Sequence, residues 1–464
     1  MGTNYPDDTI AALSTPYGEG GIAIVRISGP DALEAASRLY ESPSGRRGAK
    51  FAHHKALYGR AVDPKDGSYI DEAIFLPMLS PRSYTTEDVV EIQCHGGMTC
   101  VAGILGALFQ TGVRQALPGE FTRRAFLGGR IDLIQAEAVM DVIEAKSDES
   151  LSMAMDQLEG KYSRELEDFK KRIVEAAALI EAPIDYPDED LYLEDSKEAM
   201  DRLMTLRMEA RRMLELSSGG RLYREGARAA LIGKPNTGKS SVLNMLLGED
   251  RAIVSDTAGT TRDTVEDYCV MEGIAIRLCD TAGIRDAECS VERLGIERSR
   301  EAAAGSDLVI TVLDSSSDAS EEDLAVLSLA SAGGRPFIAL LNKSDLPPKF
   351  PEEVLKGMNC RAVRVSAKTG EGRMELEEAI ASRLKGMFRA SSTSRFIASQ
   401  RHREALSQIE SNLGEAVEAA AAGMPGDVCS VPLRSAIRAL EALTGESYDE
   451  DILDSVFSKF CIGK

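Results

Sequence analysis

The stretch Gly233-Lys-Pro-Asn-Thr-Gly-Lys-Ser240 decides the fold of the central part of this 464-residue chain. It follows the apolar run Ala229–Ile232 and precedes the helical run Ser241–Leu247, so a strand, a glycine-rich turn and a helix come in that order. Such a turn lets backbone N–H groups surround phosphates, while its lysine reaches the β- and γ-phosphates and its last hydroxyl binds Mg²⁺. The sequence therefore predicts a P-loop in which the nucleotide contacts Asn236, Thr237, Gly238, Lys239, Ser240 and Ser241, with Ser240 also a magnesium ligand.

The residues after this turn alternate between apolar strands and helices. The expected strands are Ala229–Ile232, Ile274–Cys279, Leu308–Leu313, Phe337–Leu341 and Ala362–Val365. This alternation is typical of a mostly parallel, doubly wound sheet. We expect an inserted Ras-like G domain over residues 223–385.

Three further motifs follow in the order that a guanine nucleotide site requires. The first is Thr260-Thr261 in "DTAGTTRD", which supplies a switch threonine to magnesium, and we favour Thr261 for this role. The second, Asp280–Gly283, ends a strand where a carboxylate holds Mg²⁺ through water and the Gly283 N–H meets the γ-phosphate. The third is the pair Asn342-Lys343-Ser344-Asp345 and Ser366-Ala367-Lys368, in which the Asp345 carboxylate accepts the two adjacent N–H donors of guanine, a pair that adenine lacks. The complete set of expected nucleotide contacts adds Ser255, Asp256, Thr257, Ala258, Gly259, Thr260, Thr261, Asp280, Thr281, Ala282, Gly283, Asn342, Lys343, Asp345, Ser366, Ala367 and Lys368 to those of the P-loop.

The stretch Asp280-Thr-Ala-Gly-Ile-Arg-Asp286 departs from the familiar small GTPases. Ile284 stands where those proteins have the glutamine that orients the attacking water. One candidate for this task is Glu292, at the start of a helical run. A glutamate in a first helical turn also complements the helix dipole, so spacing alone leaves both readings of Glu292 open.

The sequences before and after the expected G domain have different secondary-structure patterns. Residues 1–128 read as α+β, with β-rich runs at Ile22–Ile27, Ile74–Leu79 and Val89–Ile92. Residues 129–222 and 386–464 have helical periodicity, interrupted by Pro183 and Pro187 and by the Ser-rich linker at 390–394. The expected fold class is multidomain α+β and α/β: an N-terminal α+β domain, a discontinuous helical domain and an inserted α/β domain.

The composition restricts the functional classes. The chain has 54 basic and 75 acidic residues, a net charge of −21, which argues against broad electrostatic binding to nucleic acid or membranes. No signal peptide pattern or run long enough to cross a bilayer occurs, and the eight cysteines are scattered without a C-x-x-C pair. We expect a cytoplasmic protein without a disulfide framework or zinc site.

Several stretches resemble the MnmE (TrmE) family of tRNA-modification GTPases. The resemblance runs from about residue 7 to Lys464. It rests on "DDTIAALSTPYGEGGIAIVRISG", "YTTEDVVEIQCHGG", "PGEFTRRAFLGGRIDLIQAEAV", "IDYPDED", "PNTGKSS", "TAGTTRD", "DTAGIR", "VERLGIER", "NKSD" and the terminal "CIGK".

The resemblance implies how hydrolysis proceeds without the glutamine. In this family a potassium ion beside the phosphates replaces an arginine finger, and the asparagine that binds it matches Asn236. The remaining potassium ligands map to Ser255, Thr257 and Thr260, and the water-orienting glutamate maps to Glu292. Two G domains of a homodimer meet face to face over the ion.

The resemblance also implies a folate site and a biological role. The positions that bind a 5-formyl-tetrahydrofolate-type cofactor in this family match Arg26, Glu91, Arg130 and Lys464. Some relatives are expected to have lysine at the Arg130 position, and lysine and arginine differ in hydrogen-bond geometry. Without the resemblance, each of the four residues would be interpreted as part of a surface ion pair. We expect these residues to meet because the C-terminus packs on an N-terminal domain across a dimer. The implied function is addition of a carboxymethylaminomethyl or aminomethyl group to C5 of the tRNA wobble uridine, together with the flavoprotein MnmG (GidA).

Cys461 has two readings. A thiol can attack C6 of uridine, whereas a small buried residue near a C-terminus is the structural alternative.

Three rival functions share parts of these patterns. A ribosome-assembly GTPase needs a basic RNA-binding appendage, which is not seen in the sequence. A folate-dependent aminomethyltransferase with a regulatory G domain transfers its one-carbon group without GTP or a partner, and a GTP-binding scaffold does not turn GTP over.

Overall fold

The computed structural model describes residues 8–185, 194–217, 224, 226–253, 268–280, 300–332, 337–388 and 399–464, which form two compact units. Unit 1 holds the described residues up to 140 together with 441–464, and unit 2 holds those from 141 to 440. No helix of the described part of the chain is long and apolar enough to cross a membrane.

A seven-stranded sheet of strand order β3-β4-β5-β6-β2-β1-β7 forms the centre of unit 1. Its neighbouring strands pair antiparallel, except for the parallel pair β1–β7. The strands are β1 (Ile10–Leu13), β2 (Gly20–Ser28), β3 (Tyr40–Glu41), β4 (Leu57–Val62), β5 (Tyr69–Met78), β6 (Val89–Gly96) and β7 (Arg114–Gln115).

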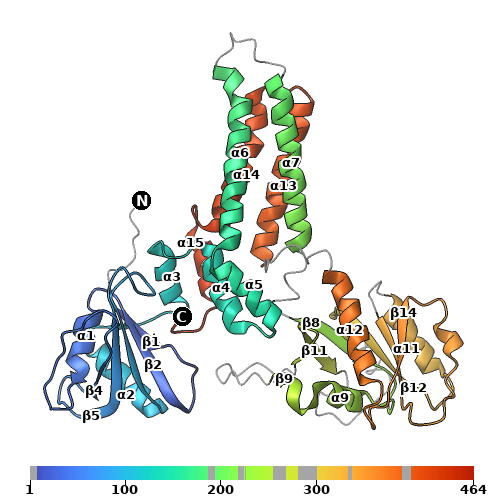
Figure 1. Ribbon diagram of the computed structural model, residues 1–464, viewed down its shortest axis with the longest axis horizontal. Coiled ribbons are helices and arrows are strands. Elements are labelled where there is room, and N and C mark those ends of the chain that lie inside the picture. The colour runs from blue at the N-terminus through green and yellow to red at the C-terminus, as the bar shows by residue number, and fades with distance from the viewer. Residues whose placement is uncertain are drawn as a thin grey trace. The chain divides into compact units, whose positions relative to one another are not determined.

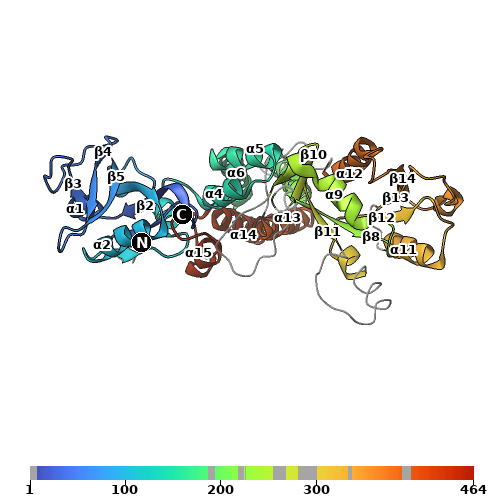
Figure 2. The ribbon, with the colours of Figure 1, turned by 90° about the horizontal axis from the view of Figure 1, so that it is seen from below.

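Two helices, α1 (Ala32–Leu39) and α2 (Met98–Phe109), cover one face of this sheet (Figure 2). Strand alternation sends Val25, Phe75 and Ile92 into the core beneath them. The next residues along the strands lie on the opposite face, which therefore carries Arg26 of β2 and Glu91 of β6.

The end of the chain belongs to this unit. Helices α3 (Glu120–Leu127) and α4 (Leu133–Glu144) pack with α15 (Glu450–Phe457) through Phe126, Leu133 and Phe457. Beyond α15, the backbone N–H of Phe121 donates to the Lys464 carbonyl oxygen at 3.1 Å. The Gly463 carbonyl accepts from Ser14 Oγ at 3.0 Å, and a Cβ at Gly463 (φ +98°) would lie 1.9 Å from Leu13 O. Only glycine fits this approach.

An ionic cluster with a buried centre fastens α3 to β7 and to the residues that precede β1. Glu120 is 2% exposed and accepts hydrogen bonds from Arg114 at 2.7 Å, Arg124 at 3.0 Å and the Leu117 N–H at 2.7 Å. Burial alone would raise the pKa of Glu120, but these donors outweigh it and hold the pKa below its ordinary value of 4.5. Asp8 pairs with the same two arginines.

In unit 2, α7 packs against α6 and against α13, and these long helices run side by side with α14 (Figure 1). Arg434 of α14 pairs with Glu181 of α6 at 2.7 Å. The helices are α5 (Asp148–Leu158), α6 (Lys161–Asp185), α7 (Glu194–Ser217), α13 (Gln400–Ala421) and α14 (Gly426–Thr444). The helical region is thus discontinuous, as the sequence predicted.

The second seven-stranded sheet has the order β14-β13-β12-β8-β11-β10-β9. Strands β11, β8, β12, β13 and β14 are mutually parallel. Helix α9 packs against β8, β10 and β11 (Figure 2), and α12 covers the same face, while α11 covers the other. The elements are β8 (Ala227–Ile232), α9 (Lys239–Arg251), β9 (Ala252–Ile253), β10 (Tyr268–Met271), β11 (Ile274–Asp280), β12 (Leu308–Asp314), α11 (Glu321–Ala332), β13 (Phe337–Asn342), the short 3₁₀ helix η1 (Glu352–Leu355), β14 (Cys360–Arg364) and α12 (Arg373–Phe388).

The expected fold class and the five expected strands of this sheet are confirmed. Sequence analysis missed the antiparallel strand β10, which is only four residues long and pairs with β11 across the turn Glu272-Gly273. It was also wrong to break the first long helix at Pro183, because α6 continues to Asp185. A proline in a last turn removes a single helical hydrogen bond, which the rest of a 25-residue helix tolerates. Pro187 and the linker at 390–394 lie outside the described residues.

Substitution of Glu120 by glutamine should destabilise unit 1 by about 3 kcal/mol, because Arg124, whose side chain is 3% exposed, would lose a buried charged partner. The measurement is urea-dependent hydrogen exchange in peptides covering β1 and α3, which separates this unit from the rest of a multidomain chain. The control is Glu34→Gln, which removes an exposed pair with Arg38 and should cost under about 0.5 kcal/mol.

The pKa of Glu120 fixes the sign of the pH dependence. Since this pKa lies below 4.5, the stability that the Glu120 carboxylate adds to the wild type over Glu120→Gln is fully present above pH 4.5. This contribution is lost as the pH falls through the lower, folded-state pKa. An equal loss of unfolding free energy in Glu120→Gln and Glu34→Gln at pH 7 would show that the cluster adds nothing beyond an exposed ion pair.

Candidate functional site

The carboxyl ends of the parallel strands bring the nucleotide motifs to one edge of the second sheet. Gly233 follows β8, and Asp280 ends β11 in register with Leu231 of β8. Asp314 ends β12 in register with Asn342, which ends β13. Open parallel sheets bind ligands at this edge.

The phosphate loop has the backbone that its glycines predict. Gly238 has a φ of +93°, and a Cβ there would lie 2.3 Å from Asn342 Nδ2; a Cβ at Gly233 would lie 2.4 Å from Val312 O. Asn236 also has a left-handed φ of +62° and is exposed. Asparagine is among the few residues with a side chain that tolerate this conformation.

Lys239 and Thr237 both bond to the loop's own backbone. Lys239 Nζ donates to the carbonyl oxygens of Gly233 and Lys234, each at 2.9 Å, and Thr237 Oγ1 donates to Lys234 O at 3.1 Å. The backbone of the loop is therefore bonded by its own side chains, and the Lys239 ammonium group lies against the loop's carbonyl oxygens. Ser240 and Ser241, at the start of α9, are exposed.

The guanine motifs join the phosphate loop through the side chain of Asn342, which is 2% exposed. Its Nδ2 donates to Thr237 O at 2.8 Å, and its Oδ1 accepts from the Ala367 N–H at 3.0 Å. Ser366 Oγ donates to Asp345 Oδ1 at 2.7 Å, which orients the carboxylate expected to recognise guanine. Lys368 is exposed on the same loop.

Asp314 is a residue of this edge that sequence analysis missed. Lys343, at a left-handed φ of +65°, donates from Nζ to Asp314 Oδ2 at 2.6 Å. Burial would raise the pKa of Asp314, but Lys343 and Ser316 outweigh it and lower the pKa. The signal was an aspartate directly after the strand Leu308–Leu313, at the edge where Asn342 also lies.

The remaining expected contacts lie outside the described residues. These are Ser255, Asp256, Thr257, Ala258, Gly259, Thr260, Thr261, Thr281, Ala282, Gly283 and Glu292. Ile284, which stands at the position of the glutamine, lies outside the described residues as well. For Asp280 only the backbone position at the end of β11 is described.

In unit 1, Arg26 and Glu91 face each other across β2 and β6. Arg26 Nε and Nη2 donate to Glu91 Oε1 at 3.0 and 2.9 Å, while Oε2 has no hydrogen-bond partner among the described residues. Two guanidinium groups lie over the Tyr84 ring, whose centroid is 5.1 Å from Arg26 Cζ and 4.9 Å from Arg130 Cζ. Sequence analysis missed Tyr84, although it opens the stretch "YTTEDVVEIQCHGG".

The C-terminus reaches the same place. Arg26 Nη1 lies 3.5 Å from the Gly463 carbonyl oxygen, and Arg130 Nη1 donates to Tyr84 O at 2.9 Å. Burial, followed by the charge of Arg26, lowers the pKa of Lys464. These contacts form within one chain, so the second copy that we expected is not needed to bring the four residues together.

Cys461 is exposed, so its structural alternative, a buried thiol, is wrong. Its carbonyl oxygen accepts from the Gly119 N–H at 3.4 Å and the Lys464 N–H at 3.3 Å.

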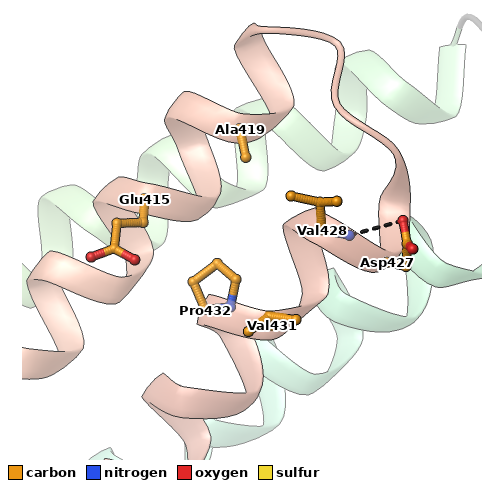
Figure 3. A pocket seen from close by; sticks show the side chains of 6 residues that line it. All are labelled: Glu415, Ala419, Asp427, Val428, Val431 and Pro432. Carbon is orange, nitrogen blue, oxygen red and sulfur yellow. Dashed lines mark hydrogen bonds between the residues drawn. The ribbon is translucent and has the colours of Figure 1, made fainter.

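A pocket of about 420 Å³ lies between α13 and α14 and contains no residue that the sequence singled out (Figure 3). Val428, Val431 and Pro432 line one side, and Glu415 and Ala419 line the other, with Asp427 at the start of α14.

Models of two protein families match the chain. The MnmE helical domain matches residues 133–461, and the GTP-binding protein TrmE N-terminus matches residues 9–130.

Full-length relatives are also similar. A tRNA modification GTPase MnmE from Heliobacterium modesticaldum is 44% identical over 98% of this chain and 99% of its own length. The protein of the same name from Ligilactobacillus salivarius is 41% identical over the whole of both chains. Among solved structures, the G domain of T. maritima FeoB is 28% identical over 34% of this chain and 98% of its own, with a TM-score of 0.27.

The helical-domain match spans more than two thirds of the residues, the N-terminal match spans the first sheet, and the relatives are similar from end to end. The chain therefore belongs to the MnmE family of tRNA modification GTPases.

Proposed function

We propose that this protein hydrolyses GTP to drive modification of tRNA. The observation that carries the proposal is the Asn342 side chain, which joins the phosphate loop at Thr237 to the guanine loop at Ala367. Lys239 and Ser240 then face the phosphates, and Asp345, oriented by Ser366, accepts the N–H donors of guanine. The charged β- and γ-phosphates are stronger acceptors for the Lys239 ammonium group than the neutral carbonyl oxygens of Gly233 and Lys234.

Hydrolysis in this proposal depends on potassium. The residues fit such an ion in one respect: Asn236 is exposed, and within the described chain its amide has no hydrogen-bond partner. An amide oxygen is a suitable ligand for a hard cation. Ser255, Thr257 and Thr260 supply the other potassium ligands, Ser240 and Thr261 bind Mg²⁺, and Glu292 orients the attacking water. A bound cation supplies the transition-state charge that an arginine finger supplies elsewhere.

A 5-formyl-tetrahydrofolate-type cofactor binds, we propose, at Arg26, Glu91, Arg130 and Lys464. The donor set fits it: Glu91 keeps Oε2 for a pterin N–H group while Arg26 holds Oε1. The Tyr84 ring and the two cations beside it offer a flat surface and charge for a carboxylate tail. Cys461, exposed near Lys464, is the candidate thiol.

The proposed product is a carboxymethylaminomethyl or aminomethyl group at C5 of the wobble uridine, made in the cytoplasm with a flavoprotein of the MnmG (GidA) type. The proposed domains are 1–128 for folate binding and dimerisation, 129–222 and 386–464 for the helical part, and 223–385 for GTP. The face of the first sheet opposite α1 and α2 supports a homodimer, since Tyr58 (55% exposed) and Ile74 (39%) lie there in register.

Substitution of Asn236 by alanine should abolish the stimulation of GTP hydrolysis by potassium. The wild type should hydrolyse GTP at least about tenfold faster in KCl than in NaCl, because potassium but not sodium fits the proposed cation site beside the phosphates. The same change at the exposed Asn359 of this domain is the control and should leave the ratio intact. A variant whose rate still responds to potassium would remove Asn236 from the site.

Glu91→Gln should weaken binding of 5-formyl-tetrahydrofolate by about tenfold or more, since an amide replaces a charged acceptor. Titration calorimetry measures the affinity. Glu72→Gln, on the neighbouring strand β5 and exposed, is the matched control. Equal affinities for the two variants would locate the folate elsewhere.

Nucleoside mass spectrometry of tRNA tests the whole reaction. With this protein, the flavoprotein, GTP and folate present, C5-modified wobble uridine should accumulate, and omission of any one should stop it. Lys239→Ala, which removes the cation expected on the phosphates, should also stop it. Modification without GTP would favour the aminomethyltransferase alternative.

A further inference from the structure

Lys234, the second residue of the phosphate loop, makes an ion pair that the motif does not require. Its Nζ lies 2.7 Å from Asp323 Oδ2 in α11 and 3.2 Å from Ser320 Oγ. The side chain of Asp323 is 2% exposed and that of Lys234 is 19% exposed. The pair is therefore a nearly buried tether between two elements more than eighty residues apart.

The acceptor of this tether is itself firmly placed. Asp323 Oδ2 accepts from the Ser320 N–H at 3.0 Å and from Ser320 Oγ at 2.7 Å, and the Asp323 N–H bonds back to Ser320 Oγ at 3.3 Å. These reciprocal bonds form a capping box at the start of α11. Asp323 Oδ1 has no partner among the described residues, so Lys234 is the cation that balances this buried carboxylate there.

The other end of the tether reaches the groups that meet the nucleotide. The carbonyl oxygen of Lys234 accepts both Lys239 Nζ and Thr237 Oγ1. The position of the Lys234 carbonyl oxygen thus sets the positions of the Lys239 ammonium group and the Thr237 hydroxyl.

The segment that leads into α11 is fixed at both ends. Asp314, at its start, pairs with Lys343 of the guanine motif at 2.6 Å. Ser320 and Asp323, at its end, hold Lys234 of the phosphate loop. The turn between β12 and α11 consequently connects the two halves of the nucleotide site through contacts separate from those of Asn342.

We propose that Lys234 and Asp323 are a positioning pair that sets the geometry of the phosphate loop and thereby the affinity for guanine nucleotides. The proposal rests on the proposed GTP site. Neither side chain is assigned a contact with the nucleotide, so the pair acts through the carbonyl of Lys234. A tether of this kind affects binding of GDP and GTP alike and leaves the chemical step unchanged.

The test is the affinity and dissociation rate of a fluorescent GDP analogue, with the KM and kcat of GTP hydrolysis, in the full-length chain. Lys234→Met should raise the dissociation constant and KM by about tenfold, equivalent to about 1.4 kcal/mol, with kcat within about twofold. Asp323→Asn should do the same, and the double variant should be no worse than either single variant. Lys234→Arg keeps the charge and should bind within about threefold of wild type.

The control is Lys356→Met, which removes an exposed pair with Glu353 in the same domain and should leave affinity unchanged. Thermal unfolding is followed for every variant, and rescue by Lys234→Arg distinguishes loop geometry from a general loss of folding.

Affinities of Lys234→Met and Asp323→Asn within twofold of wild type would overturn the inference, as would additive losses in the double variant. The proposed GTP site is judged separately by Lys239→Ala. If that variant loses binding while Lys234→Met does not, the tether is wrong and the GTP site stands; a wild-type chain that binds no guanine nucleotide would overturn both.

Discussion

The nucleotide edge of the second sheet depends on one amide, that of Asn342. Its donor end holds Thr237 O and its acceptor end holds the Ala367 N–H, so one side chain connects three loops that follow different strands. A buried amide is costly unless all of its bonds are made, and both of these are made inside the protein. The contact also explains Gly238, because any Cβ at that residue would occupy the place of the Asn342 nitrogen.

In the proposed site, affinity and chemistry are supplied by different parts of the chain. The described loops proposed to hold the base and the phosphates are joined to one another by short hydrogen bonds within one domain. The groups assigned to hydrolysis, from Ser255 to Thr261 and at Glu292, lie in other segments. A GTPase that holds its nucleotide in one set of loops and takes its hydrolytic groups from other segments can couple turnover to another event.

The sequence predicted the parallel strands and the positions at their carboxyl ends because turn chemistry and β-periodicity are local. It did not predict partners that only the folded topology brings together. Asp314 meets Lys343 because β12 and β13 are in register, and Lys234 meets Asp323 because α11 returns to the phosphate loop. In the first unit, Tyr84 and the intrachain docking of Lys464 were missed for the same reason, since residues 26, 84, 130 and 464 share no local pattern.

Docking of Gly463 and Lys464 against Ser14, Arg26 and Phe121 has a consequence for folding. The Ser14–Gly463 hydrogen bond joins residues 449 positions apart in the sequence. The entropy cost of closing so long a loop is repaid only after the intervening chain has become compact, so these contacts should form late in folding.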